Sequence, residues 1–237
     1  MLNIIEPARV FQYDYIYVDL IFLIGWLGLL IYFRKRAALV VASVIAPIIY
    51  AIDAVWWWRS GVREYTIGGE SLVEGSFTWL KFGADWMMTI SFSLFMFAWI
   101  WIMFEWLYKR NSREVTLISA YFLAAWMLTP FLSRFVGWND ALVETVRHTN
   151  SLFWIINFVI GYSLLSVIYW REPKKILLVF LIGASGSLMM ELPLLIWGIR
   201  PLSLSFFVFE IIFLMNQGMP YLFLFYDKVA RNREKTA

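Results

Sequence analysis

Seven long apolar runs constrain the fold of this chain more than any other feature of its sequence. They cover about residues 15–33, 38–58, 82–108, 115–136, 151–170, 175–199 and 202–226. Each is close to the roughly 20 residues that an α-helix needs to cross the hydrocarbon core of a bilayer. None shows the alternation of apolar and polar residues that marks the strands of a membrane β-barrel. We therefore expect an all-α, seven-transmembrane-helix bundle that forms a single integral-membrane domain over residues 1–237.

The composition agrees with a multi-pass membrane protein and excludes several kinds of chemistry. Hydrophobic residues make up 62% of the chain and charged residues 16%, whereas soluble domains are about half apolar and about a quarter charged. The chain has no cysteine, so it has neither disulfides nor a thiolate nucleophile, and its single histidine, His148, cannot form a two-histidine metal site. We expect no metal, no cofactor and no nucleic-acid partner. The expected partners are membrane lipids and a lipophilic small-molecule substrate, and the oligomeric state is left open.

Lysine and arginine residues near the ends of the apolar runs predict the orientation of the bundle. Thirteen of the 20 lie on one side, in short clusters: Arg34, Lys35, Arg36, Lys109, Arg110, Arg113, Arg171, Lys174, Lys175, Lys228, Arg231, Arg233 and Lys235. Such clusters stay in the cytoplasm, so we expect the N-terminus outside and the C-terminus in the cytoplasm. The long connections, 59–81 and 137–150, lie on the outer side. Residues 59–81 are expected to be an exposed loop, because they contain turn residues such as Gly68-Gly69.

Two glutamates flank a tight corner at Arg200-Pro201. Glu191 lies nine residues before Arg200 and Glu210 nine residues after Pro201. If both flanks are helices, the two carboxyls lie at the same depth, roughly 13 Å from the corner at 1.5 Å per residue. A carboxyl at that depth is costly to bury and is by default a functional-site hypothesis. The alternative is that these acids only hold helices together through hydrogen bonds.

Further polar groups share the outer half of the predicted bundle with the two glutamates. The full set comes from six helices: Asp19, Asp53, Asp85, Asn157, Glu191 and Glu210. Aromatic residues and one glutamine fall on the same helical faces: Tyr50 and Trp57 near Asp53, and Phe206, Phe207, Phe213 and Gln217 near Glu210. We expect these side chains to line one pocket with acids in its wall, although Asp19 and Asp85 could instead reach the membrane interface.

A carboxyl buried among aromatic rings favours its neutral form, and a neutral acid can donate a proton. The ring faces could then stabilise a developing cation. This combination suits acid-initiated cyclisation or isomerisation of a lipophilic isoprenoid. It also suits a proton-coupled small-molecule carrier, in which an acid is loaded and unloaded. A non-catalytic membrane subunit is the third alternative.

Three short stretches resemble the small seven-helix integral-membrane terpene cyclases of meroterpenoid and indole-diterpene pathways. They are Tyr50-Ala-Ile-Asp53-Ala-Val-Trp56-Trp57, Trp79-Leu-Lys-Phe-Gly-Ala-Asp85 and Phe209-Glu210. The resemblance implies that Asp53 and Glu210 handle the proton and that Asp85 supports them. The chain lacks the Asn-x-x-Trp-Glu signature of the family's second helix, and its last-helix acid is Glu where the family has Asp. Together with Glu191, these acids are the candidate catalytic residues.

Overall fold

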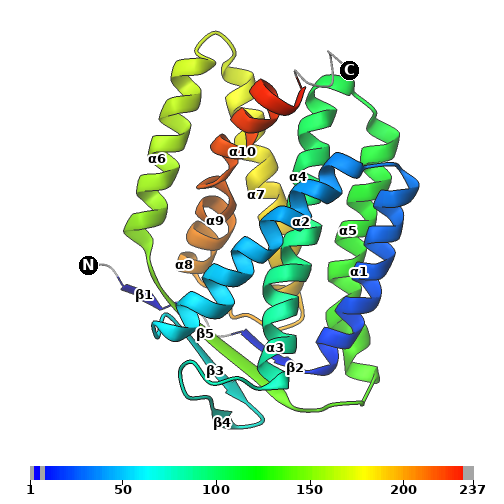
Figure 1. Cartoon of the computed structure of the whole chain (residues 1–237), viewed down its shortest axis with the longest axis vertical. Coiled ribbons are helices and arrows are strands. Elements are labelled where there is room, and N and C mark those ends of the chain that lie inside the picture. The colour runs from blue at the N-terminus through cyan, green and yellow to red at the C-terminus, as the bar shows by residue number, and fades with distance from the viewer. Residues whose placement is uncertain (1–2, 6–8, 232–237) are drawn as a thin grey trace.

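Long helices make up most of the protein in the computed structural model, which describes residues 3–5 and 9–231 (Figure 1). Six helical stretches are long and apolar enough to cross a membrane: Asp14–Tyr32, Arg36–Trp57, Trp79–Lys109, Ser112–Phe135, Pro173–Ile196 and Phe207–Ala230. A seventh apolar helix, Leu152–Ile168, is shorter. The predicted helical bundle is thus confirmed, and the six long apolar stretches among the described residues are consistent with an integral membrane protein. The seventh span and the orientation stay predictions, and Arg233 and Lys235, two of the cations that support the orientation, lie outside the described residues.

Several spans are built from more than one helical segment. The α-helices are α1 Asp14–Tyr32, α2 Arg36–Tyr50, α3 Trp79–Asp85, α4 Phe92–Lys109, α5 Ser112–Leu132, α6 Ser151–Ile168, α7 Pro173–Ile196, α8 Leu204–Phe206, α9 Leu214–Asn216 and α10 Met219–Phe225. Four π-helical segments continue them: η1 Ala51–Trp57, η2 Trp86–Ser91, η4 Phe207–Phe213 and η5 Tyr226–Ala230, while η3 Ser133–Phe135 is a 3₁₀ turn. Asp53 lies in η1, Glu210 lies in η4, and Asp85 directly precedes η2. Because π-helical turns occur frequently at functional sites, their coincidence with three candidate acids favours a site here.

Strands from the two outer connections and from residues 3–5 and 9–12 form an antiparallel β-sheet, which the expectation of a loop over 59–81 did not include. Gly68 and Gly69 do form an exposed turn. The strands of the sheet are β1 Asn3–Ile5, β2 Arg9–Gln12, β3 Arg63–Ile67, β4 Glu70–Ser71 and β5 Leu142–Asn150. The long β5 is central: it pairs with β3 along one edge and with β1 and β2 along the other. The sheet closes one end of the bundle, which we call the sheet end, and the short α1–α2, α4–α5 and α6–α7 turns lie at the opposite end, the turn end (Figure 1).

Alternation along the strands explains which side chains the sheet turns towards the helices. In β3 the residues Arg63, Tyr65 and Ile67 are buried, whereas the Glu64 between them is exposed. In β5 the buried positions are Val143, Thr145 and Arg147. Successive side chains of a strand point to opposite faces, so both strands turn one arginine towards the bundle. Arg63 and Arg147 are direct cross-strand partners, a placement of like charges that is unfavourable by itself.

Two apolar clusters fill the interior. The larger one follows the helices and stacks aromatic rings, with Trp26 5.0 Å from Phe95 and Phe95 5.7 Å from Phe122, centroid to centroid. The smaller one lies under the sheet and includes Phe11, Tyr65 and Val143. The sheet is therefore packed on the bundle as part of the same fold, which brings its arginines into the interior of the sheet end.

Candidate functional site

The Asp53 carboxylate is held by an arginine from the sheet. Arg63 Nε and Nη2 donate to the two carboxylate oxygens of Asp53, the second bond measuring 2.6 Å. Arg63 Nη1 donates to Thr145 Oγ1 at 3.1 Å, which fixes the guanidinium from the neighbouring strand. Burial alone would lower the pKa of Arg63, but the Asp53 carboxylate raises it above its usual value. Strand β3 and segment η1 are thus joined by a two-pronged charged contact in the interior.

The two glutamates of the hairpin meet around the arginine of their own corner. Arg200 Nη1 lies 3.3 Å from Glu191 Oε2 and 3.2 Å from Glu210 Oε1. Each glutamate also has a second cation from the sheet: Arg9 Nη2 lies 2.8 Å from Glu191 and Arg147 Nη2 lies 2.7 Å from Glu210. Burial and the nearby Arg200 lower the pKa of Arg9. Glu191 and Glu210 thus share Arg200, which lies between their carboxylates.

Asp85 belongs to a separate buried group under the sheet. Lys81 Nζ, one helical turn earlier, lies 2.5 Å from Asp85 Oδ2, and the Tyr65 hydroxyl donates to Asp85 Oδ1 at 2.5 Å. Lys81 Nζ also donates to the Ala54 carbonyl oxygen at 3.1 Å and lies 4.9 Å from the centroids of the Trp58 and Tyr65 rings. Burial raises the pKa of Tyr65 well above its usual value, so this phenol stays a hydrogen-bond donor.

Each of the four candidate acids therefore has a cationic side chain within hydrogen-bond distance. Proton donation requires a carboxyl that faces its substrate, whereas each of these carboxyls faces a cation of the protein. Asp53, with both oxygens bound by one guanidinium, has the geometry of a charge-assisted bidentate pair. The arrangement is thus better suited to positioning arginine side chains than to delivering a proton.

A cavity of ≈300 Å³ lies at the sheet end between η1, α6, α9 and the strands. The charged part of its wall consists of Arg9, Arg63, Arg147 and Asp53. The remainder is almost entirely apolar or aromatic, with the amide of Gln217 as an exception: Ile49, Ile52, Trp57, Met88, Phe92, Phe97, Phe153, Trp154, Leu214, Met215 and Gly218. The cavity thus combines a guanidinium-rich wall with a large apolar surface.

The Arg147 guanidinium is stacked between two aromatic rings of this cavity. Its central carbon lies 5.4 Å from the centroid of Trp57 and 5.1 Å from that of Trp154. A guanidinium over an aromatic face is attracted by the ring quadrupole. Both rings therefore already have a cation against them, supplied by the protein.

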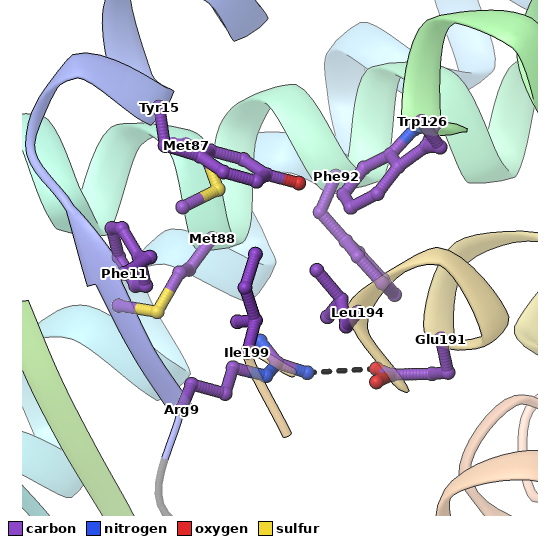
Figure 2. Close-up of a pocket in the computed structure, with 10 residues that line it drawn as sticks. All are labelled: Arg9, Phe11, Tyr15, Met87, Met88, Phe92, Trp126, Glu191, Leu194 and Ile199. Atoms are coloured by element: carbon purple, nitrogen blue, oxygen red, sulfur yellow. Dashed lines mark hydrogen bonds and ion pairs between the residues drawn. The ribbon is translucent and has the colours of Figure 1, made fainter. Parts of the chain in front are cut away.

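A second cavity, of ≈20 Å³, lies beside the first (Figure 2). Figure 2 shows the Arg9–Glu191 ion pair at its edge and the Tyr15 ring reaching towards Phe92. A cavity of this volume is about large enough for one water molecule. Arg9 lines both cavities, so it connects the larger pocket with the glutamate pair.

No protein-family model, curated protein or solved structure matches this chain. A function can therefore be inferred only from the residues of the site.

The structure distributes the candidate residues between the cavity and its surroundings. Asp53, Trp57 and Gln217 line the large cavity. Glu191, Glu210 and Asp85 lie in the ion-pair groups described above. The remaining candidates are not in the cavity lining: Tyr50 packs near Phe82, Asn157 donates to the Phe153 carbonyl, Phe206 lies under Arg200, Phe207 is half-exposed, and Phe213 packs on Phe158.

Sequence reasoning missed the three arginines of the cavity wall. Arg9, Arg63 and Arg147 are among the seven basic residues that lie outside the thirteen clustered on the predicted cytoplasmic side. The signal that could have found Arg147 is the content of β-branched residues in Leu142-Val-Glu-Thr-Val-Arg-His, which is typical of a strand. Read as a strand with one buried face, this segment places Arg147 on the same side as Val143 and Thr145.

Proposed function

We propose that this protein binds a lipophilic small molecule that carries an anionic group, within the large cavity at the sheet end. The observation that carries the proposal is the composition of the cavity wall, in which three guanidiniums and one carboxylate face a largely apolar volume. An arginine has five N–H donors and matches carboxylate and phosphate groups in geometry. The anionic group would lie against Arg9, Arg63 and Arg147.

The size and position of the cavity support an amphiphilic ligand. Small-molecule sites in proteins have volumes of about 300–1,000 Å³ and are mostly apolar, with a few placed polar groups. Phe153, at the start of α6, lines the cavity and is 63% exposed. Its exposure puts one side of the cavity at the flank of the helical bundle, where an acyl or isoprenoid chain could enter from the lipid.

Binding of a fluorescent polyene fatty acid, cis-parinaric acid, to the detergent-solubilised protein tests the proposal. We expect the free acid to bind at least about tenfold more tightly than its methyl ester, because a charge-assisted hydrogen bond contributes about 1.5–3 kcal/mol. This comparison changes only the ligand and leaves the ion pairs of the protein intact. Equal affinity of acid and ester would contradict the proposed recognition of an anionic group.

A pair of glycine substitutions tests the location of the site. A Cβ on Gly218, which lines the cavity, would have only the Met215 carbonyl oxygen within 4 Å, at 3.8 Å, so Gly218→Leu should fold and fill part of the cavity. Gly28 on α1 has nothing within 4 Å, and Gly28→Leu is the matched control. We expect cis-parinaric acid binding to be lost in the first variant and retained in the second. Binding that survives Gly218→Leu would place the ligand elsewhere.

A second proposal is acid-initiated cyclisation or isomerisation of an isoprenoid in the same cavity. It is supported by Asp53, a carboxyl in the cavity wall on a π-helical segment, and by the aromatic rings opposite. The Arg63 contact with both Asp53 oxygens and the Arg147 guanidinium on Trp57 and Trp154 weigh against it. Turnover of squalene monoepoxide by the wild type, lost in Asp53→Asn with unchanged fold, would favour this chemistry. No turnover by the folded wild type would leave binding as the proposed function.

A further inference from the structure

The turn end contains a second group of charged and aromatic side chains, which the proposed function does not use. Asp227 in η5 is buried and accepts hydrogen bonds from the hydroxyls of Tyr108, at 2.6 Å, and Tyr169. Arg231 Nη2 lies 2.8 Å from Asp227 Oδ1, the oxygen that also accepts the hydrogen bond from Tyr108. This group, which we call the Asp227 cluster, joins the ends of α4, α6 and the last span.

Three cations surround the two tyrosine rings of the Asp227 cluster. Lys175 Nζ lies 4.7 Å from the Tyr169 ring centroid and 5.6 Å from that of Tyr108. Arg231 lies 4.0 Å from the Tyr108 ring and Lys228 lies 5.1 Å from the Tyr169 ring. Burial and the Asp227 carboxylate raise the pKa of Tyr169, so this phenol stays neutral and adds no negative charge. Lys175, Lys228 and Arg231 thus share a small area with Asp227 and with Glu172, which lies 2.7 Å from Lys175.

The cationic side chains of the Asp227 cluster are more exposed than its carboxylate. The Lys228 side chain is 56% exposed, whereas that of Asp227 is 3% exposed. Arg231 Nε is buried and has no hydrogen-bond acceptor among residues 3–5 and 9–231. An anion approaching from outside would therefore meet ammonium and guanidinium donors before it met the carboxylate.

The depth of the cluster is that of lipid headgroups. Trp170, next to Tyr169, is 68% exposed, and the Arg171 guanidinium lies 4.6 Å from its ring centroid. Exposed tryptophans beside basic residues mark the membrane–water interface in helical membrane proteins. Basic residues at this depth attract anionic lipids.

We propose that Lys175, Lys228 and Arg231 bind the phosphate group of an anionic phospholipid at the turn end. The phosphate would accept hydrogen bonds from the three cations, while the two tyrosine rings lie against the charged groups of the same side chains. Arginine and lysine are both suited to phosphate, the first through its planar fork and the second as a point charge.

Native mass spectrometry of the full chain released from mixed phosphatidylglycerol and phosphatidylcholine nanodiscs tests this site. We expect phosphatidylglycerol to be retained in preference to phosphatidylcholine, and Lys228→Gln to weaken its retention about fivefold, as expected for one juxtamembrane charge. Lys228→Arg should restore it. The matched control is Lys174→Gln, which removes an exposed charge from the same end of the protein and should have a smaller effect.

Three outcomes would overturn the proposal. Equal retention of the two lipids by the wild type would show no preference for an anionic headgroup, and an equal loss in Lys174→Gln and Lys228→Gln would indicate only a diffuse positive surface. The third concerns the source of the phosphate: if inorganic phosphate displaces phosphatidylglycerol from the wild type and stabilises the lipid-free protein, the ligand is a soluble phosphate. Failure of fatty-acid binding at the sheet end would leave this site unaffected, because the two groups lie at opposite ends of the bundle (Figure 1).

Discussion

The two ends of the bundle pair their charges in different ways. At the sheet end, ion pairs join residues that are far apart in the sequence, as Arg9 and Glu191 are, 182 positions from one another. At the turn end, Arg231 pairs with Asp227 and Lys175 with Glu172, at spacings of four and three residues. Each end also has pairs of the other kind, because Lys81 and Asp85 at the sheet end are four residues apart and Lys35 at the turn end pairs with Glu105 and Glu114. What is particular to the sheet end is that arginines of the strands pair with acids of the helices.

Burial differs between the ends as well. Lys81, Asp85 and Glu210 at the sheet end are almost completely buried. At the turn end Asp227 is buried as well, but its partners Arg231 and Lys228 are 26% and 56% exposed, and Glu172 is itself 55% exposed. Removing one partner of a buried pair leaves an uncompensated charge and costs about 3–5 kcal/mol, whereas exposed pairs contribute about 0–1 kcal/mol. Replacing a single charged residue is therefore expected to lower the free energy of unfolding most at the sheet end.

The largest effect is expected for Lys81→Met. This change removes the ammonium from Asp85 and leaves its carboxylate with the Tyr65 hydroxyl as its remaining hydrogen-bond donor among the contacts described above. We expect the free energy of unfolding to fall by about 4 kcal/mol, measured by denaturant titration in detergent with circular dichroism. A loss below about 1 kcal/mol would mean that a buried charge at the sheet end contributes no more to stability than an exposed pair at the turn end.

The double variant Lys81→Met with Asp85→Leu tests whether the loss of stability comes from the unpaired Asp85 carboxylate. Replacing both members of a buried pair with apolar residues is often neutral or stabilising, so we expect most of the lost unfolding free energy to return. The same titration measures it. A double variant as unstable as Lys81→Met would mean that Lys81 acts through its Ala54 contact or the Trp58 and Tyr65 rings.

An intermediate effect is expected at the turn end for Tyr169→Phe. The change removes one hydrogen bond to the Asp227 carboxylate while Tyr108 and Arg231 remain. Hydrogen bonds to charged groups contribute about 1.5–3 kcal/mol, and we expect a loss near the lower value. Tyr32→Phe, at an exposed tyrosine of the same end, is the control and should leave stability unchanged. A loss equal to that of Lys81→Met would make the two ends equivalent.

The smallest effect is expected for Glu172→Gln. Its pair with Lys175 is largely exposed, so its removal should change the unfolding free energy by less than about 0.5 kcal/mol. Any such change should shrink in high salt, because exposed charges are screened over roughly 10 Å at 0.1 M. A change of several kcal/mol that persists in salt would show that Glu172 belongs to the buried part of the Asp227 cluster.

The sequence predicted the parts of the fold that depend on local composition. Apolar runs near 20 residues indicate spanning helices whatever their neighbours are. The symmetric spacing around Arg200 predicted equal depth for Glu191 and Glu210, and in the structure both carboxylates contact Arg200. The sheet escaped prediction because its central strand pairs with segments more than 70 residues away, so that turn residues such as Gly68 were the more visible signal. The arginines that pair with Asp53, Glu191 and Glu210 were not predicted either, because Arg9, Arg63 and Arg147 come from those strands.

The cross-strand placement of Arg63 opposite Arg147 has a consequence for assembly. Two guanidiniums facing each other oppose the pairing of β3 with β5 until Asp53 and Glu210 are present to receive them. Those carboxylates come from η1 and η4, near opposite ends of the chain. The register of β3 against β5 is therefore expected to form after the first and last thirds of the protein have packed together. A chain released before its final span is synthesised should leave these strands unpaired and open to protease.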